Sequence, residues 1–167
     1  MWDQRVELEV GDRTHRLIGE LVTGAATSPG DAARRVLAAR PVSGTRAASV
    51  RMRMASAAST YKLRFQPPAA LVGVEVPLGA GVADLVWERP DGMVVVDEVK
   101  SGAITADDRR LIAQVARLVA GGHARWGELF VGVRVCPLRR PARTVLAVGA
   151  AGGRLVTVVL PGWLEVR

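Results

Sequence analysis

The chain contains a single cysteine and only two histidines among its 167 residues. One cysteine, Cys136, cannot form an internal disulfide, which favours a reducing compartment. The same scarcity excludes a four-cysteine zinc or iron–sulfur site. Two histidines, His15 and His123, are too few for a histidine-rich metal site, and we expect both to lie at the surface.

Long apolar runs and aromatic residues are also scarce. Hydrophobic residues make up 49% of the chain, yet no apolar run approaches the ~18 residues that suggest a membrane span. The N-terminus lacks a charged segment followed by an apolar one, so we predict a cytoplasmic protein with no membrane contact. An aromatic content of 4% leaves base stacking only a small part in any nucleic-acid binding. The length predicts one domain over residues 1–167 with a sizeable core.

Lysine is nearly absent, with two residues against 21 arginines. One of the two, Lys100, follows an apolar run and stands next to a carboxylate in Glu98-Val99-Lys100. Arginine is a broad planar fork that stays charged, whereas lysine is a compact charge whose proton affinity responds to its surroundings. A retained lysine here therefore predicts a position where arginine would not serve, such as the neighbourhood of an attacking water. Chance retention is the alternative, and it is sufficient for Lys62.

Acidic residues are missing from residues 32–74, which carry eight basic side chains. Residues 75–108 hold eight acids and two bases, and residues 109–167 hold ten bases and two acids. An acidic centre between basic flanks is typical of a metal-dependent enzyme that acts on a polyanion. The alternative is the arginine bias of a GC-rich bacterial or phage genome. That bias explains many arginines but not an acid-free stretch of 43 residues.

Two β-branched apolar runs, residues 81–88 and 93–100, flank Pro90-Asp91-Gly92, a sequence typical of a hairpin turn. If Arg89 faces Met93 across this turn, the numbers of facing residues sum to 182. Asp84 then lies directly opposite Glu98.

Side chains alternate between the two faces of a strand, so Asp84, Glu98 and Lys100 share one face and Asp97 points to the other. Facing like charges destabilise a strand pair, whereas a hard cation such as Mg²⁺ binds one or two carboxylates and leaves its other positions to water and phosphate oxygens. Glu75, on an expected strand over residues 71–77, is a candidate third carboxylate. A solvent-exposed acidic pair on an edge hairpin is the alternative, and the unbroken valine runs disfavour it.

A Gly-x-x-Asp segment ending at Asp84, then 13 residues, then Glu98-Val99-Lys100 resembles the motif of the PD-(D/E)XK nuclease superfamily, which has the restriction-endonuclease-like fold. Ala83 stands where the family name has proline, a departure that many members share. The resemblance covers residues 71–136. It implies an α/β fold with an αβββαβ core around a mixed central sheet. A basic N-terminal extension over residues 1–70 and a C-terminal hairpin over residues 143–163 would complete the domain.

The resemblance implies a metal-dependent nuclease that hydrolyses phosphodiester bonds in DNA. Asp84, Glu98 and the backbone carbonyl of Val99 would hold one or two Mg²⁺ or Mn²⁺ ions. Lys100 would orient the attacking water or stabilise the developing charge. Several branches of the superfamily carry a glutamine on the following helix that reaches the site, and Gln114 is the candidate here. A solvated glutamine is the alternative.

Two branches of the superfamily remain open. Gln114 is similar to the glutamine of helicase-associated exonucleases, whereas the compact core from Asp84 to Ser101 resembles junction resolvases and small repair or defence endonucleases. The partner would be DNA, with a homodimer, a helicase or a defence complex as further partners. The alternative function is a catalytically silent nuclease-fold module that binds DNA or assembles with a larger complex. The intact Asp, Glu and Lys set counts against that alternative, and a basic protein that only coats nucleic acid leaves the acidic hairpin unexplained.

The remaining segments predict the other elements. Residues 6–10 and 13–18 suggest a hairpin, residues 31–40 a helix, and residues 129–135 a strand. Residues 49–54 and 61–65 fit either a DNA-facing strand pair or a surface helix with a basic face. A helix starts at the capping-box-like residues 105–108 and ends at residues 121–122, and residues 144–148 and 154–160 form a second hairpin. Glu20 is a weaker candidate for the acid that the family often places on its first helix. The arginines expected to grip phosphates are Arg51, Arg53, Arg64, Arg109 and Arg110.

Overall fold

The computed structural model describes residues 4–102, 104, 108–139, 145–151 and 154–159. The chain begins with the helices α1 (Gln4–Gly11), α2 (Thr14–Val22), α3 (Pro29–Ala39) and α4 (Ala47–Arg64), with the 3-10 turn η1 (Gly44–Arg46) before α4. The strands β1 (Ala70–Leu78), β2 (Gly81–Glu88) and β3 (Val94–Lys100) follow. After them come α5 (Arg109–Trp126), the 3-10 turn η2 (Gly127–Leu129), β4 (Phe130–Pro137), β5 (Val145–Ala151) and β6 (Arg154–Val159). The order from α4 to β4 is helix, three strands, helix and strand, as predicted.

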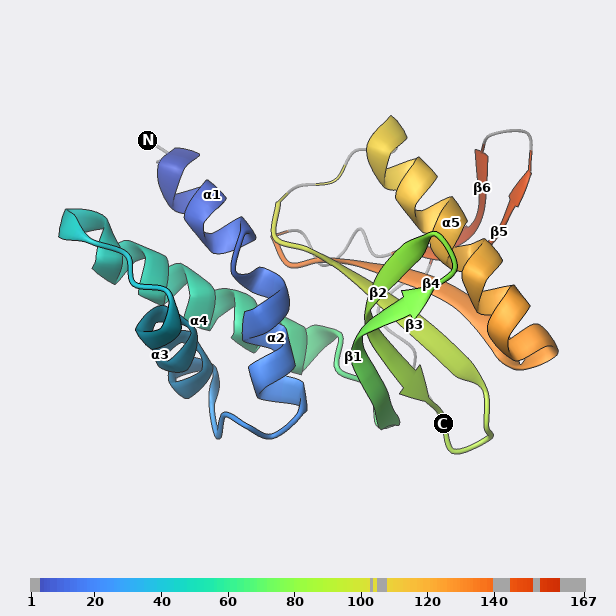
Figure 1. Cartoon of the computed structure of the whole chain (residues 1–167), viewed down its shortest axis with the longest axis horizontal. Helices are drawn as coiled ribbons and strands as arrows, with labels where there is room; N and C mark the ends of the chain where they lie inside the picture. The colour runs from blue at the N-terminus through green and yellow to red at the C-terminus, as the bar shows by residue number, and fades with distance from the viewer. Residues whose placement is uncertain (1–3, 103, 105–107, 140–144, 152–153, 160–167) are drawn as a thin grey trace.

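The six strands form one mixed sheet in the order β1 to β6. Among the described strands, only β3 and β4 pair in parallel, because α5 carries the chain across the sheet between them. Helices α1 to α4 gather on one side of the sheet, and α5 lies against the other face (Figure 1). The predicted α/β class with a mixed central sheet is confirmed, and so is the C-terminal hairpin of β5 and β6.

The β2–β3 hairpin has the predicted register. Its pairs run from Glu88↔Val94 at the turn to Leu85↔Asp97. The backbone N–H of Arg89 donates to the carbonyl of Met93 at 2.9 Å, so these two residues close the turn. Gly92 adopts a φ of 79°, which glycine accepts at no steric cost.

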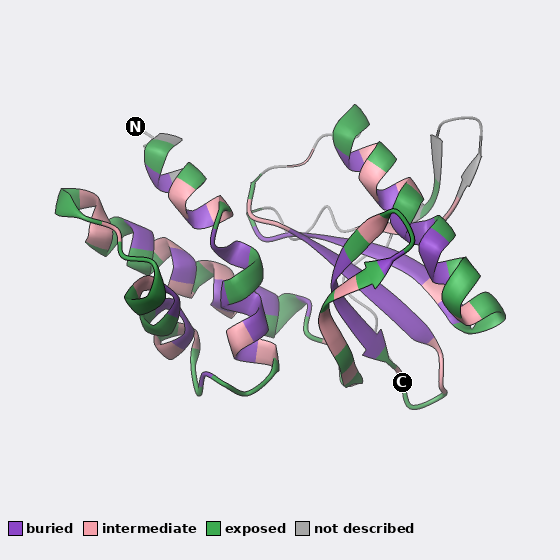
Figure 2. Ribbon diagram, viewed as in Figure 1, coloured by how far each residue is buried: buried purple, intermediate pink, exposed green. Residues whose placement is uncertain are grey.

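Apolar side chains form one layer on each side of the sheet. Toward α1–α4, the β2 residues Leu85 and Trp87 pack with Leu17, Ile18 and Tyr61. Toward α5, the layer comprises Val86, Val96, Leu111, Val115, Leu118 and Val133, among others. Strand β3 is therefore covered on both faces and buried at every position except Lys100, which accounts for its unbroken valine run (Figure 2).

The predicted N-terminal hairpin is wrong, because these residues form α1 and α2. Val6 and Val10 are both buried, whereas Leu8 between them is 68% exposed. Burial four residues apart is the spacing of a helix, and a strand would have buried all three on one face. For residues 49–54 and 61–65, the helical alternative is correct, since both segments lie in α4 except Phe65, which is its C-cap.

Helix α3 starts close to its predicted position, where the Ser28 side chain accepts from the Asp31 N–H at 3.1 Å. Helix α5 has Asp108 as its N-cap, and the start predicted at residues 105–107 lies outside the described residues. Its predicted end at Gly121 and Gly122 is wrong, because the helix continues to Trp126. None of the described helices combines the length and hydropathy that a membrane span requires.

The two glycines allow α5 to approach the sheet closely. A Cβ on Gly121 would lie 2.7 Å from the carbonyl oxygen of Leu78, and one on Gly122 would lie 2.4 Å from the Phe130 ring. These positions are therefore packing contacts between helix and sheet and do not mark a helix end.

Candidate active site

The candidate site lies where β2 and β3 separate. Their pairing stops at Leu85↔Asp97, although β2 extends back to Gly81 and β3 on to Lys100. Asp84 is the first β2 residue beyond the paired segment, and its Oδ2 accepts from the backbone N–H of Val99 at 2.7 Å. The carboxylate thus bonds to a β3 backbone group and is held beside the end of that strand.

Glu98 is fully buried on the α5 side of β3. Its Oε1 accepts from the Gln114 side-chain amide at 2.7 Å and forms an ion pair with the Lys100 ammonium at 2.5 Å. Its Oε2 is also buried and has no hydrogen-bond partner among the described residues. A buried carboxylate oxygen without a partner is costly, and it is an available ligand atom for a cation.

Lys100 and Gln114 complete this arrangement. The Lys100 ammonium donates to the Gln114 Oε1 at 3.0 Å, so the amide of Gln114 bridges Lys100 and Glu98. The Lys100 side chain is 26% exposed and therefore lies at the boundary between the buried carboxylates and solvent. The structure brings Asp84, Glu98, Lys100 and Gln114 together from three elements. Gln114 is not the solvated side chain of the alternative.

His15 is a neighbour that sequence reasoning assigned to the surface. Its Nδ1 lies 3.3 Å from the Asp84 Oδ1, although the imidazole is 44% exposed on α2. The two residues are 69 positions apart, so no local pattern could have paired them. The only signal was the scarcity of histidine itself. Imidazole and carboxylate side by side are both groups that bind divalent metals.

The environment of Asp84 raises its pKa to about 7. Burial is the main cause, and the negative charge of Glu98 adds to it. His15, the Val99 N–H and Lys100 act in the opposite direction without cancelling the shift. Without a cation, the site therefore favours one proton on Asp84 over two adjacent carboxylates.

The oxygen atoms of this site suit a hard divalent cation. Asp84 and Glu98 supply two carboxylates, and the Val99 carbonyl belongs to the residue that follows Glu98. Glu98 Oε2 has no hydrogen-bond partner among the described residues. Two protein carboxylates are a common number for Mg²⁺, which keeps water or phosphate oxygens in its other positions. No group of three or more acidic, histidine or cysteine side chains with metal-binding geometry occurs among the described residues.

The two further acidic candidates have other surroundings. Glu75 lies between the β1 residues that pair with Ala83 and Leu85, which places it opposite Asp84 in the register. Its φ is 51° and its side chain is exposed, and no hydrogen bond or ion pair joins it to Asp84. Glu20 accepts from Arg35 at 2.8 Å at the surface of the helical side.

Asp97 points away from the site, as the alternation predicted. It is fully buried and pairs with the equally buried Arg134 of β4. Its Oδ2 also accepts from the Tyr61 hydroxyl at 2.6 Å and the Trp87 indole at 3.1 Å. This buried network joins α4, β2, β3 and β4 directly behind Glu98. Burial disfavours the charge on Arg134, but Asp97 outweighs that effect and raises the pKa of Arg134 above its usual value.

The arginines expected to grip phosphates lie on two helices. Arg51, Arg53 and Arg64 belong to α4, and Arg109 and Arg110 form the first turn of α5. All but the half-buried Arg53 are exposed. Met52 and Leu63 form an exposed apolar stripe along α4. Arg51 lies on one side of this stripe around the helix axis and Arg64 on the other, so the two arginines do not form a single basic row.

No family model and no curated protein sequence matches the chain. Among solved structures, a repair endonuclease from Pyrococcus abyssi is similar at 25% identity and a TM-score of 0.35. The similarity covers 42% of this chain and 30% of that one. A second similar structure, an EndoMS-dsDNA2 complex, has 17% identity and a TM-score of 0.36, with 45% of this chain and 32% of that one covered. The chain thus matches about a third of the length of each of these proteins.

Proposed function

We propose that the protein is a metal-dependent nuclease that hydrolyses phosphodiester bonds in DNA. One observation carries the proposal: Asp84, Glu98 and Lys100, with Gln114 from α5, converge where β2 and β3 separate. Two buried carboxylates beside a lysine are an unfavourable arrangement for stability alone, because burial and mutual repulsion oppose their charges. The arrangement is explained if the carboxylates hold a cation and the lysine serves a reacting phosphate.

Asp84, Glu98 and the Val99 carbonyl would hold Mg²⁺ or Mn²⁺, with His15 beside Asp84 as a further available ligand. When bound, the cation would supply positive charge to the phosphate and lower the pKa of a water. Lys100 has three N–H donors, and two of them are directed at Glu98 and Gln114. The third would donate to the attacking water or to a phosphate oxygen as negative charge develops there.

Gln114 would position the other two groups. Its amide N–H holds Glu98 and its carbonyl oxygen holds the Lys100 ammonium. The lysine is thereby kept at the solvent edge of the site, where a phosphate can reach it. The basic side chains of α4 and of the first turn of α5 would bind the rest of the DNA backbone.

A specific observation favours the second candidate, a catalytically silent module that binds DNA or assembles with a larger complex. Glu98 is fully buried, and its Oε1 already binds both Lys100 and Gln114. These protein contacts partly satisfy the carboxylate without a metal ion. Calorimetric titration of the protein alone with Mg²⁺ or Mn²⁺ separates the two candidates. Binding that disappears in Asp84→Ala supports the enzyme, and the absence of binding supports the silent module.

Incubation with linear, nicked, branched and single-stranded DNA in Mg²⁺ or Mn²⁺ tests the activity directly. We expect cleavage of at least one substrate by the wild-type protein and none by Asp84→Ala or in the presence of EDTA. Cleavage that survives both treatments would show that a contaminant or another site is responsible. The preferred substrate would also distinguish an exonuclease from a structure-specific endonuclease.

A further inference from the structure

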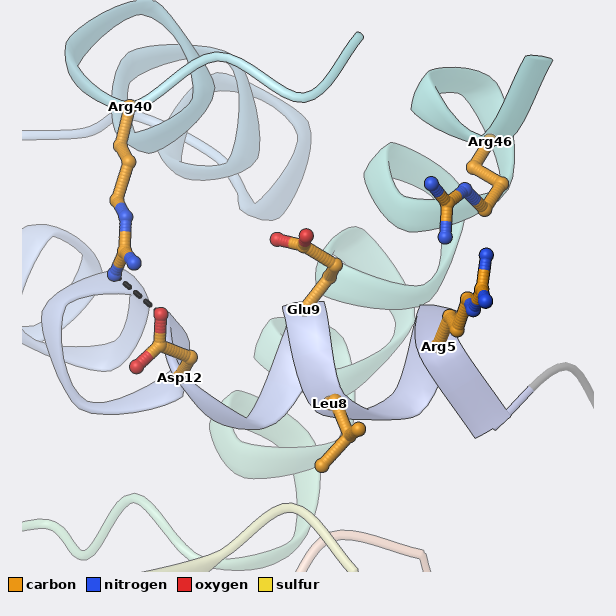
Figure 3. Close-up of a pocket in the computed structure, with 6 residues that line it drawn as sticks. All are labelled: Arg5, Leu8, Glu9, Asp12, Arg40 and Arg46. Atoms are coloured by element: carbon orange, nitrogen blue, oxygen red, sulfur yellow. Dashed lines mark ion pairs between the residues drawn. The ribbon is translucent and has the colours of Figure 1, made fainter. Parts of the chain in front are cut away.

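A pocket of about 540 Å³ lies on the helical side of the molecule, outside the candidate active site. Its lining comes from α1, η1 and the residues that follow α1 and α3: Arg5, Leu8, Glu9, Asp12, Arg40 and Arg46 (Figure 3). Pockets of roughly 300–1,000 Å³ hold small organic ligands, so this one has room for a nucleotide and not only for an inorganic ion.

The acidic side chains of this pocket are already neutralised. Asp12 forms an ion pair with Arg40, and Glu9 forms one with Arg13, a buried residue that does not line the pocket. The guanidinium group of Arg46 makes no hydrogen bond or ion pair with the part of the chain that the structure describes. Positive charge therefore remains in excess at this end of the pocket.

Arg5 and Arg46 reach into the same space from α1 and from η1 (Figure 3). Two guanidinium groups directed at one space can both donate hydrogen bonds to an anion that lies between them. Guanidinium groups bind phosphate through two parallel hydrogen bonds, which makes arginine the usual choice for such a site. Leu8, an apolar side chain that is 68% exposed, lies on the same pocket and offers a surface for a sugar or base.

The end of α1 beside the pocket lies close to the residue that follows Lys100. Gly11 ends α1 directly before the pocket residue Asp12, and a Cβ on Gly11 would lie 3.1 Å from the Ser101 Oγ. Ser101 follows Lys100 in the chain. A nucleic-acid strand bound at Lys100 would therefore reach the pocket a few nucleotides away from the phosphate at Lys100.

We propose that this pocket binds a phosphate group of the nucleic-acid strand between Arg5 and Arg46, with Leu8 against the attached nucleoside. This inference rests on the proposed function for its substrate class and adds a second anchoring point beside the scissile position. The phosphate is either a terminal one or an internal phosphodiester, and the two share the same chemistry of recognition.

The test is fluorescence-anisotropy binding of the full chain to three labelled single-stranded oligonucleotides in EDTA, which prevents cleavage. They share one sequence and carry a 5′-phosphate, a 3′-phosphate or no terminal phosphate. Arg46→Gln should weaken binding by about tenfold, as expected for loss of a charge-assisted pair. Arg46→Lys should be intermediate, because it keeps the charge but loses the fork. Arg34→Gln is the matched control, since Arg34 is 76% exposed on α3 and outside the pocket.

Each outcome decides the proposal. A loss confined to one phosphorylated oligonucleotide assigns the pocket to that terminal phosphate, and an equal loss on all three assigns it to an internal one. If Arg46→Gln binds all three as Arg34→Gln does, with the same melting temperature, the proposal is overturned. If Arg46→Gln alone has a lowered melting temperature, Arg46→Lys becomes the deciding variant. Wild-type affinity of Arg46→Lys for all three oligonucleotides would then overturn the inference.

The binding assay also separates this inference from the proposed function. If the protein cleaves no DNA but Arg46→Gln still loses affinity for the oligonucleotides, the pocket stands and the nuclease assignment fails. If the wild-type protein cleaves DNA and Arg46→Gln has an unchanged KM and an unchanged affinity, the nuclease stands and the pocket fails.

Discussion

At the scale of single residues, Lys100 is the side chain whose chemical type matters most. Its ammonium contacts both Glu98 and Gln114. A guanidinium group is broader and would have to displace one of these two partners. We expect Lys100→Ala to reduce the cleavage rate by at least about 100-fold, with DNA affinity changed only a few-fold because the phosphate grip lies elsewhere. Lys100→Arg should also be poor, since a guanidinium does not fit a point-charge position. Single-turnover cleavage and binding in EDTA would measure the two effects, and full activity of the arginine variant would refute this role.

Asp84 makes a prediction about stability and pH. Its pKa of about 7 in the folded protein lies above the 3.8 that is usual for an aspartate, so the folded protein keeps a proton that the unfolded chain releases. The metal-free protein should therefore lose stability as the pH rises from about 4 to about 7, by up to about 4 kcal/mol for this group. Asp84→Asn should remove that slope and be the more stable protein at pH 8, because asparagine can still accept the Val99 N–H.

Denaturant unfolding in EDTA across this pH range would measure the slope. Glu75→Gln is the control, because it removes an exposed carboxylate from the neighbouring strand and should leave the slope unchanged. Mg²⁺ or Mn²⁺ should raise the stability of the wild-type protein at pH 8 and not that of Asp84→Asn. A variant that is less stable than the wild-type protein over this range would instead mean that Asp84 stabilises the fold as an ion-pair partner.

At the scale of secondary-structure elements, the turn chemistry was sufficient to predict the hairpin. Pro90-Asp91-Gly92 determined the register of β2 and β3, and that register placed Asp84 beside Glu98. The first helices could not be predicted in the same way, because residues 6–10 alternate like a strand. Their helical form depends on Val6 and Val10 packing against the helices that follow, which is a tertiary effect. The His15–Asp84 contact likewise depends on how α2 lies beside the sheet.

The close packing of α5 predicts a specific effect of a small substitution. Gly121→Ala would bring its methyl group against the backbone of Leu78, which cannot move as a side chain can. The helix would be displaced from β1, and with it Gln114 from Glu98. We expect a loss of about 1–3 kcal/mol in the free energy of unfolding and a reduced cleavage rate. Gly102→Ala is the control, since nothing lies within 4 Å of its Cβ position. Unchanged stability in Gly121→Ala would show that α5 is not held as closely as described.

The buried network around Asp97 connects four elements and predicts a larger effect. Arg134→Met would leave the Asp97 carboxylate buried with only the Tyr61 and Trp87 donors. Removing one partner of a buried ion pair costs about 3–5 kcal/mol, because the remaining charge is uncompensated. Urea unfolding would measure the loss, and Arg89→Met, an arginine paired with Asp91 at the hairpin turn, is the control. A loss below about 1 kcal/mol would mean that the ion pair of Asp97 and Arg134 contributes little to the stability of the fold.

At the scale of the whole molecule, the charge distribution predicts how DNA is held. If the basic residues of α4 and α5 contact phosphates, binding should depend steeply on salt, with a log–log slope of about 0.9 per phosphate contact. Neutralising Arg51, Arg53, Arg64, Arg109 or Arg110 singly should each reduce that slope by about one and weaken binding equally on unrelated sequences. Arg89→Gln at the hairpin turn, at the far end of β2 and β3 from Lys100, should change little. Equal losses from Arg89 and the other arginines would show that the basic segments are compositional and do not form a binding face.

Asp97 and Glu98 are consecutive in the chain, yet one is tied into the helical side of the sheet and the other faces α5. The charge that anchors the strand and the charge proposed to hold metal are thus separated by the thickness of a single β-strand. A Glu98→Gln protein should therefore fold normally and bind its natural substrate, but it should not cleave that substrate. Such an inert variant would serve as an affinity reagent, and sequencing the strands it retains from a cell extract would identify the nucleic acid that the wild-type protein acts on.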